Sequence, residues 1–230
     1  MKQHYEKIIV ACCFLSLFIN IGLNSTAFAV YQPFIVALPG LGDSAGSFIV
    51  STRVLVSVVA TLFVNRFYEL LDVRVGLSLA TALTGGAFLV YSYASTLPAF
   101  LAGAALAGVA YGLGGLVATA TLVNRWFKSG IGTAVGTASV GSGVAGFVIP
   151  VAATNVIEGN SLMAAFTAEA VLSFALAALI FVFLRNRPAD VGLDRYESKA
   201  AESGRGREQA ERISHGIELS RGRRMLVLVA

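Results

Sequence analysis

The stretch from Val75 to Asn124 contains no Asp, Glu, Lys or Arg. A single helix of that length would run roughly 75 Å, more than twice the thickness of a hydrocarbon core, so the stretch must cross a membrane twice. Comparable apolar runs precede and follow it, and 56% of the 230 residues are hydrophobic while only 13% are charged. A water-soluble domain could not cover its surface with so few charges. The chain is therefore predicted to be a polytopic membrane protein in contact with the lipid bilayer.

The membrane spans are predicted to be α-helices. In lipid every backbone amide needs a partner within the protein, and these Gly-, Ala-, Leu- and Val-rich runs lack the alternation of a barrel strand. We expect an all-α membrane protein, a six-transmembrane-helix bundle over residues 1–184, followed by a charged cytoplasmic tail over residues 185–230. The expected spans cover residues 8–36, 46–66, 75–94, 98–124, 131–153 and 161–184.

The positive charges indicate how the helices are threaded. Lys and Arg occur before the first span and after the second, fourth and sixth, whereas the connections around Asp43, Ser95 and Glu158 contain none. Basic residues are retained on the cytoplasmic side, so both termini are expected in the cytoplasm of a multi-pass protein of the cell (inner) membrane. The residues with this bias are Lys2, Lys7, Arg66, Arg74, Arg125, Lys128, Arg185 and Arg187.

The N-terminal segment allows a second interpretation. Lys2 and Lys7, an apolar core from Ile8 and the Ala-Phe-Ala triplet at 27–29 are also typical of a cleavable signal peptide. The apolar character continues through residues 30–36 without a polar mature N-terminus, which favours an uncleaved first helix.

Polar residues in the first span share one face. Asn20, Asn24 and Tyr31 recur at a spacing that places them on the same side of a helix. A polar stripe in a membrane helix avoids lipid, so this face either lines a cavity or hydrogen-bonds a neighbouring helix. Tyr111 in the fourth span is a further candidate of this kind. Together with Arg53 in the second span, these residues form the candidate substrate pathway.

Two ionisable residues lie inside predicted spans, Arg53 in the second and Glu169 in the sixth. An Arg near the membrane centre costs about 2.5–3.5 kcal/mol on insertion scales, so such residues usually have a function or a partner. In the functional interpretation Arg53 attracts a carboxylate substrate and Glu169 exchanges a proton. In the alternative they form a structural pair, because both lie toward the outer ends of their helices.

Small residues are concentrated in the fourth and fifth spans. Gly108 and Gly112, and likewise Gly132 and Gly136, have the GxxxG spacing that lets helix backbones approach closely. These glycines either hold helices together or provide smooth surfaces that slide as a transporter rocks.

No catalytic or metal-binding constellation is found in the sequence. Both His residues lie in the terminal tails, and Cys12 and Cys13 are adjacent, which supports neither His-based catalysis, nor a metal site, nor a disulfide. The glycine-rich strings lack the lysine of a phosphate loop, and the tail mixes acidic with basic residues. We therefore expect no enzyme activity, no metal, no cofactor and no nucleic-acid partner.

The connection after the fourth span has a specific pattern. Asn124-Arg125-Trp126-Phe127, followed by small residues, resembles the fourth loop and fifth helix of the major facilitator superfamily, particularly its oxalate/formate and monocarboxylate porter branch. The sequence departs from that branch at Ile131, where Arg is usual. The small residues that complete the match are Ala134, Gly136, Gly141, Ser142, Gly143 and Gly146.

Residues 65–74 resemble a reduced form of the same family's gating motif, Gly-x-Leu-x-Asp-Arg-x-Gly-x-Arg. Glu69 falls on the acidic position and Arg74 on the last basic one, whereas Asn65 and Asp72 replace the glycines. Such loops cap helix ends and lock two halves of a transporter through charge pairs. The resemblance implies a gating role for Glu69, Arg74, Arg125 and Lys128.

The resemblance covers residues 8–195, including 185–192, which are similar to the exit from the sixth helix. It implies a secondary active transporter, a symporter or antiporter, of small organic anions such as monocarboxylates or oxalate and formate. The family has twelve helices in two halves, so this chain would be an N-terminal half that needs a second half or self-association. Residues 221–230 resemble the start of a truncated seventh helix, or are an apolar end without meaning. The alternative function is a truncated, non-transporting membrane protein or scaffold.

Overall fold

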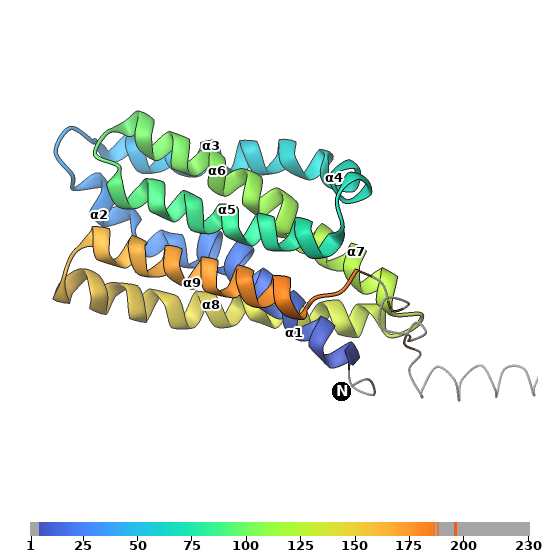
Figure 1. Cartoon of the computed structure of the whole chain (residues 1–230). Coiled ribbons are helices and arrows are strands. Elements are labelled where there is room, and N and C mark those ends of the chain that lie inside the picture. Colours follow the sequence, from blue (N-terminus) through green and yellow to red (C-terminus); the bar gives the residue numbers. More distant parts are fainter. Residues whose placement is uncertain (1–4, 187, 189–195, 197–230) are drawn as a thin grey trace, which may run out of the picture.

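The computed structural model describes residues 5–186, Pro188 and Tyr196. Six helical spans lie side by side, with their connections gathered at the two ends of the bundle (Figure 1). The start of the first span and the end of the last lie at the same end, which an even number of crossings requires. The elements are α1 (Tyr5–Leu17), η2 (Phe18–Ala27), η3 (Phe28–Val30), α2 (Gln32–Val36), α3 (Asp43–Leu62), α4 (Val64–Leu70), α5 (Val73–Tyr93), α6 (Leu97–Gly114), α7 (Leu116–Trp126), α8 (Ile131–Gly159) and α9 (Leu162–Phe183).

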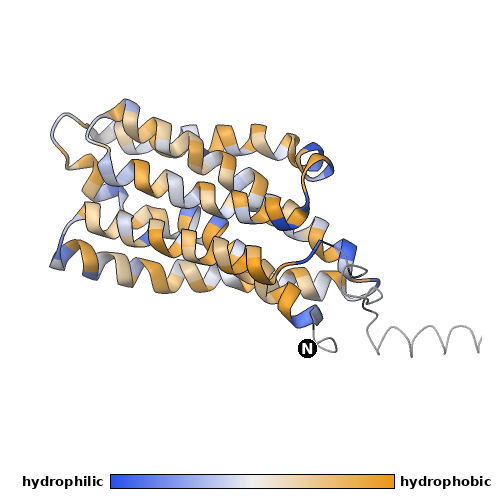
Figure 2. Cartoon of the chain, in the orientation of Figure 1, coloured by the Kyte–Doolittle hydropathy of each residue, from blue (hydrophilic) through white to orange (hydrophobic). Residues whose placement is uncertain are grey.

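The outer surface of the bundle is apolar. Hydrophilic residues are found mostly at the two ends, whereas the helices between them are largely hydrophobic (Figure 2). Large apolar side chains point outward, with Leu55 67%, Leu62 76% and Phe147 79% exposed. Exposure of such side chains would be unfavourable in water but matches a hydrocarbon solvent. The predicted all-α, six-helix membrane bundle is confirmed.

The first span is not the uniform helix expected over residues 8–36. It passes from α1 into the π-helical segment η2, a short 3-10 turn η3 and then α2. Close approach to α8 accompanies this change: a side chain at Gly22 would meet Ala145, and one at Gly141 would meet the Phe14 carbonyl. The π-helical turn alters the direction of side chains along the polar stripe.

The fourth span is interrupted, although a continuous helix over residues 98–124 was expected. Gly115 has extended backbone angles, φ −81° and ψ −151°, between α6 and α7. Two carbonyl oxygens before the break are bonded by side chains of other helices, Gly114 by the Ser16 hydroxyl at 3.2 Å and Leu113 by the Tyr68 hydroxyl at 2.8 Å. These two carbonyl groups therefore keep hydrogen-bond partners despite the break in the helix.

The two GxxxG pairs have different environments. A Cβ placed on Gly108 would lie 2.6 Å from the Arg53 carbonyl oxygen, and one on Gly112 would lie 2.7 Å from that of Ser57, so α6 packs closely on α3. In contrast, a Cβ on Gly132 or Gly136 would meet nothing within 4 Å in the described chain. Only the first pair holds two helices of this bundle together.

Candidate functional site

The polar stripe of the first span is buried between helices. Asn20 is 0% and Asn24 is 1% exposed. The Asn20 amide donates to the Ser16 carbonyl oxygen at 3.0 Å and to the Thr81 hydroxyl at 3.1 Å. Thr84 on α5 donates its hydroxyl hydrogen to Asn20 Oδ1 at 2.9 Å and accepts one from the Asn24 amide at 3.1 Å. The stripe could line a cavity or hydrogen-bond a neighbouring helix. At Asn20 and Asn24 the observed contacts are hydrogen bonds to the neighbouring helix α5.

Arg53 on α3 points back onto the first span. It is 7% exposed, and its Nη1 donates to the main-chain carbonyl oxygen of Asn24 in η2. Its guanidinium carbon lies 5.4 Å from the ring centroid of Phe28, a cation–π distance. No carboxylate of the described residues lies within ion-pair distance of Arg53. Its charge is therefore met by one carbonyl dipole and an aromatic face.

Two phenol side chains interact electrostatically with Arg53, those of Tyr91 on α5 and Tyr111 on α6. Tyr111, a predicted pathway residue, is half-buried. Tyr91 is 2% exposed, and its hydroxyl has no hydrogen-bond partner in the described chain. Tyr91 was not singled out from the sequence, although Thr84, seven residues earlier, lies on the same face of this helix and was the available signal. Arg53 thus has polar aromatic neighbours from two further helices.

Glu169 and Tyr31 meet at a small cavity between the first span, α8 and α9. The cavity has a volume of about 120 Å³, and its remaining lining is apolar, including Ile149, Ala153 and Leu172. Glu169 is 6% and Tyr31 is 0% exposed. Both carboxyl oxygens and the phenol hydroxyl are buried without a hydrogen-bond partner of standard geometry in the described chain, although the two groups interact electrostatically. The alternative expectation, a structural ion pair between Arg53 and Glu169, is not observed among the described residues.

The connections at the α4 and α7 end form a polar network. Arg125 donates from Nη1 to the side-chain oxygen of Asn186 at 2.9 Å and from Nη2 to the Tyr68 carbonyl oxygen at 3.2 Å. Asn186 also donates to Asp72 Oδ1 at 2.7 Å and accepts from the Val73 amide at 3.2 Å. One asparagine after α9 thus joins the α4/α5 connection to the end of α7.

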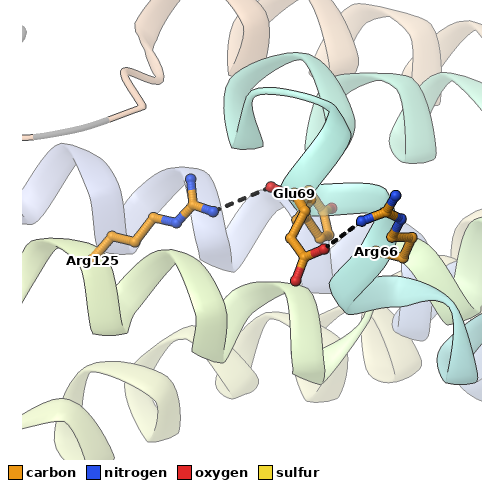
Figure 3. A network of polar contacts seen from close by, with 4 residues as sticks. Arg66, Glu69 and Arg125 are labelled. Carbon is orange, nitrogen blue, oxygen red and sulfur yellow. Dashed lines mark hydrogen bonds and ion pairs between the residues drawn. The ribbon is translucent and has the colours of Figure 1, made fainter.

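The four predicted gating residues do not form one cluster. Glu69 pairs with Arg66 on the same short helix at 3.1 Å, and both side chains are exposed (Figure 3). Arg125 instead donates to the carbonyl oxygen of Tyr68, the residue before Glu69. Arg74 donates to the Phe181 carbonyl oxygen and lies 4.2 Å from that ring centroid. The Lys128 amide donates to the Tyr196 carbonyl oxygen at 2.8 Å. Each gating residue contacts a different partner.

Sequence reasoning missed three members of this network, Tyr68, Asp72 and Asn186. Asp72 was noted only because it stands where the gating motif has a glycine. Burial raises the pKa of the Tyr68 phenol, so that its hydroxyl stays a donor to Leu113. A polar residue directly after each span was the available signal, but only the fold shows which of these residues meet.

Within the described part of the chain, no group of three or more His, Cys, Asp or Glu side chains is placed to hold a metal ion. In the described residues, the buried polar groups are amides, hydroxyls, one guanidinium and one carboxyl, dispersed over five of the six spans. Such a set can bind and orient a polar solute or a proton.

The family described as Major Facilitator Superfamily matches residues 13–229, which is most of the chain. The match agrees with six helices that are long and apolar enough to cross a membrane. The chain therefore belongs to the Major Facilitator Superfamily and is an integral, multi-pass membrane protein of the transporter type.

Proposed function

We propose that this six-helix unit is one half of a secondary active transporter for small organic anions, such as monocarboxylates or oxalate and formate. The proposed pathway is formed by Asn20, Asn24, Tyr31, Arg53 and Tyr111. The observation that supports this proposal most is the buried guanidinium of Arg53, which has no carboxylate partner among the described residues.

An uncompensated positive charge in a low-dielectric surrounding attracts anions strongly. Among the described residues, the direct contacts of the Arg53 guanidinium are the Asn24 carbonyl and the Phe28 ring, both weaker partners than a carboxylate. A substrate carboxylate could replace the carbonyl and form a bidentate pair with the guanidinium. Arg53 is therefore proposed as the anion-binding residue.

Binding at Arg53 would also act on the backbone of the first span. Its present acceptor, the Asn24 carbonyl, belongs to the π-helical segment η2, whose side chains at Asn20 and Asn24 are bonded to α5. Release of this carbonyl by a competing anion would change the balance between the π-helical and α-helical forms of η2. This gives a route from anion binding to a helix movement.

A six-helix unit forms only one wall of an alternating-access cleft, so a second unit is needed to form the other wall. That unit is supplied by a further segment, another polypeptide or a second copy of this chain. Loop contacts of Glu69, Arg74, Arg125 and Lys128 would then govern closure of the cleft at the end where α4 and α7 lie.

Uptake of radiolabelled oxalate, formate or lactate into proteoliposomes tests the proposal. Arg53→Ala is expected to abolish uptake, and Arg53→Lys to retain a fraction, because Lys keeps the charge but loses the bidentate fork. Lys7→Ala is the matched control, since Lys7 is an exposed basic residue outside both the proposed pathway and the gating loops. It should transport like the unmodified chain.

Two results would contradict the proposal. Absence of uptake of all three anions under any imposed gradient, with the chain folded and cross-linked to its second unit, would favour a non-transporting scaffold. Equal loss of uptake in Arg53→Ala and Lys7→Ala would show that Arg53 has no special role in anion binding.

A further inference from the structure

The Tyr31–Glu169 cavity contains three buried oxygen atoms that lack a hydrogen-bond partner of standard geometry in the described chain: the two carboxyl oxygens of Glu169 and the hydroxyl of Tyr31, which face each other. Unpaired buried polar groups are costly, and each calls for a partner. A water molecule needs about 30 Å³ of space and two to four polar partners. A cavity of about 120 Å³ with three oxygens meets both conditions.

The surroundings of this carboxyl do not favour its ionised form. The lining from α8 is apolar, as is Phe166, whose ring stacks on Tyr31 with centroids 4.5 Å apart. The other titratable side chain in this aromatic cluster, Tyr91 on α5, lies against Phe166 and is not a cation. Arg53 is engaged with Asn24 and Phe28 instead. A bare carboxylate here would be a buried charge without a cationic partner, which is strongly unfavourable.

We infer that this cavity is a hydrated protonation site, in which Glu169 binds a proton as a neutral carboxylic acid. On release the carboxyl O–H bond breaks and the proton passes to cavity water. The carboxylate that remains accepts a hydrogen bond from the Tyr31 hydroxyl. Glu169 lies seven residues into α9, about 11 Å from the helix start, so the site lies about two helical turns from that end of the bundle.

The binding of a proton stands apart from transport, but its use as the coupling ion rests on the proposed function. The aromatic side chains form a continuous link between the two sites. The Phe28 ring lies next to the Arg53 guanidinium, and its centroid is 5.3 Å from that of Tyr91. The Tyr91 centroid is in turn 5.6 Å from that of Phe166. A negative charge on Glu169 would attract the Arg53 guanidinium across this cluster and compete with a bound anion. Proton release and anion release are thereby linked.

Infrared difference spectroscopy of the full chain in proteoliposomes tests the protonation directly. A carboxylic-acid C=O band is expected at neutral pH and should disappear on Glu169→Gln. Tyr31→Phe should shift that band, because it removes the hydroxyl that faces the carboxyl. Glu158→Gln, at an exposed glutamate near the end of α8, is the matched control and should leave the band unchanged.

The outcomes separate the two claims. A band that persists in Glu169→Gln, or its absence at neutral pH in the unmodified chain, overturns the protonation site. Should Glu169→Gln fail to fold, the Tyr31→Phe shift decides, and an unshifted band counts against the site.

Transport measurements test the coupling. Acceleration of lactate uptake by an inward proton gradient should be lost in Glu169→Gln and kept in Glu158→Gln. If the unmodified chain shows the carboxylic-acid band but takes up no lactate, the transport function is rejected and the protonation site is retained. Uptake that keeps its gradient dependence in Glu169→Gln would reject the coupling alone.

Discussion

The side-chain oxygen of Asn186 lies 2.9 Å from Arg125 Nη1 and accepts its hydrogen bond. The two residues lie at the ends of different spans, the fourth and the sixth, and the same asparagine also bonds the α4/α5 connection through Asp72 at 2.7 Å. Three connections of the bundle therefore depend on one uncharged side chain. A neutral amide can serve as donor and acceptor at once, which neither a carboxylate nor a guanidinium can do.

Replacement of Asn186 by Ala should loosen this end of the bundle. Three hydrogen bonds are lost, two of them to charged groups, and the free energy of unfolding should fall by about 1–3 kcal/mol. The only tryptophan, Trp126, bonds the Arg185 carbonyl and stacks on Tyr5, so its fluorescence reports the change. Asn155→Ala, at an exposed position of α8, is the control. Equal stability of the two variants would contradict a role for Asn186.

Asn20 and Thr84 should be energetically coupled. Their side chains share a buried hydrogen bond of 2.9 Å between η2 and α5. In a double-mutant cycle with Asn20→Ala and Thr84→Ala, a coupling of about 0.5–2 kcal/mol in unfolding free energy is expected. A cycle that pairs Asn20→Ala with Thr121→Ala should give none, since the Thr121 hydroxyl bonds its own helix. Identical values in both cycles would refute a specific Asn20–Thr84 bond.

The two GxxxG pairs should respond differently to alanine. Gly112→Ala forces a methyl group within 2.7 Å of the Ser57 carbonyl oxygen and should destabilise the bundle by about 1–3 kcal/mol. Gly136→Ala meets open space and should be neutral or stabilising by up to about 1 kcal/mol, because alanine favours the helix. Thermal unfolding in detergent measures both. A destabilised Gly136→Ala variant with a tolerant Gly112→Ala would be contrary to this packing.

The threading of the helices can be tested by thiol labelling. In a background with Cys12 and Cys13 replaced by Ala, a cysteine at Asn160 should react with a membrane-impermeant reagent added to intact cells. A cysteine at Lys128 should react only after permeabilisation, because the basic loops are expected in the cytoplasm. The opposite pattern would invert the predicted topology.

The number of helices was predictable because hydrocarbon imposes a simple rule on the chain. Each span must be long and carry very few charges, and apolar runs separated by turn formers therefore reveal six crossings. The boundaries of the third and sixth spans fell close to those observed, α5 at Val73–Tyr93 and α9 at Leu162–Phe183. Irregular features inside spans left no comparable sign in composition. The π-helical turn of η2 and the break at Gly115 depend on contacts with α8 and with Ser16 and Tyr68.

The candidate site follows the same division. The residue types alone marked Asn20, Asn24, Arg53 and Glu169 as unusual, because a polar group within a membrane span is costly unless it has a partner. Their partners could not be derived from spacing, which describes one helix and not how its neighbours are arranged.

The amino-acid sequence by itself determined that residues 5–186 cross a bilayer as six helices and which polar side chains enter the apolar region. The tertiary structure decided that Arg53 binds the Asn24 carbonyl instead of Glu169, and that Glu169 faces Tyr31 across a cavity. The reason is physical. Transfer to lipid is a local property that sums along the chain, whereas a hydrogen bond requires two groups within about 3 Å, a condition that only helix packing can set.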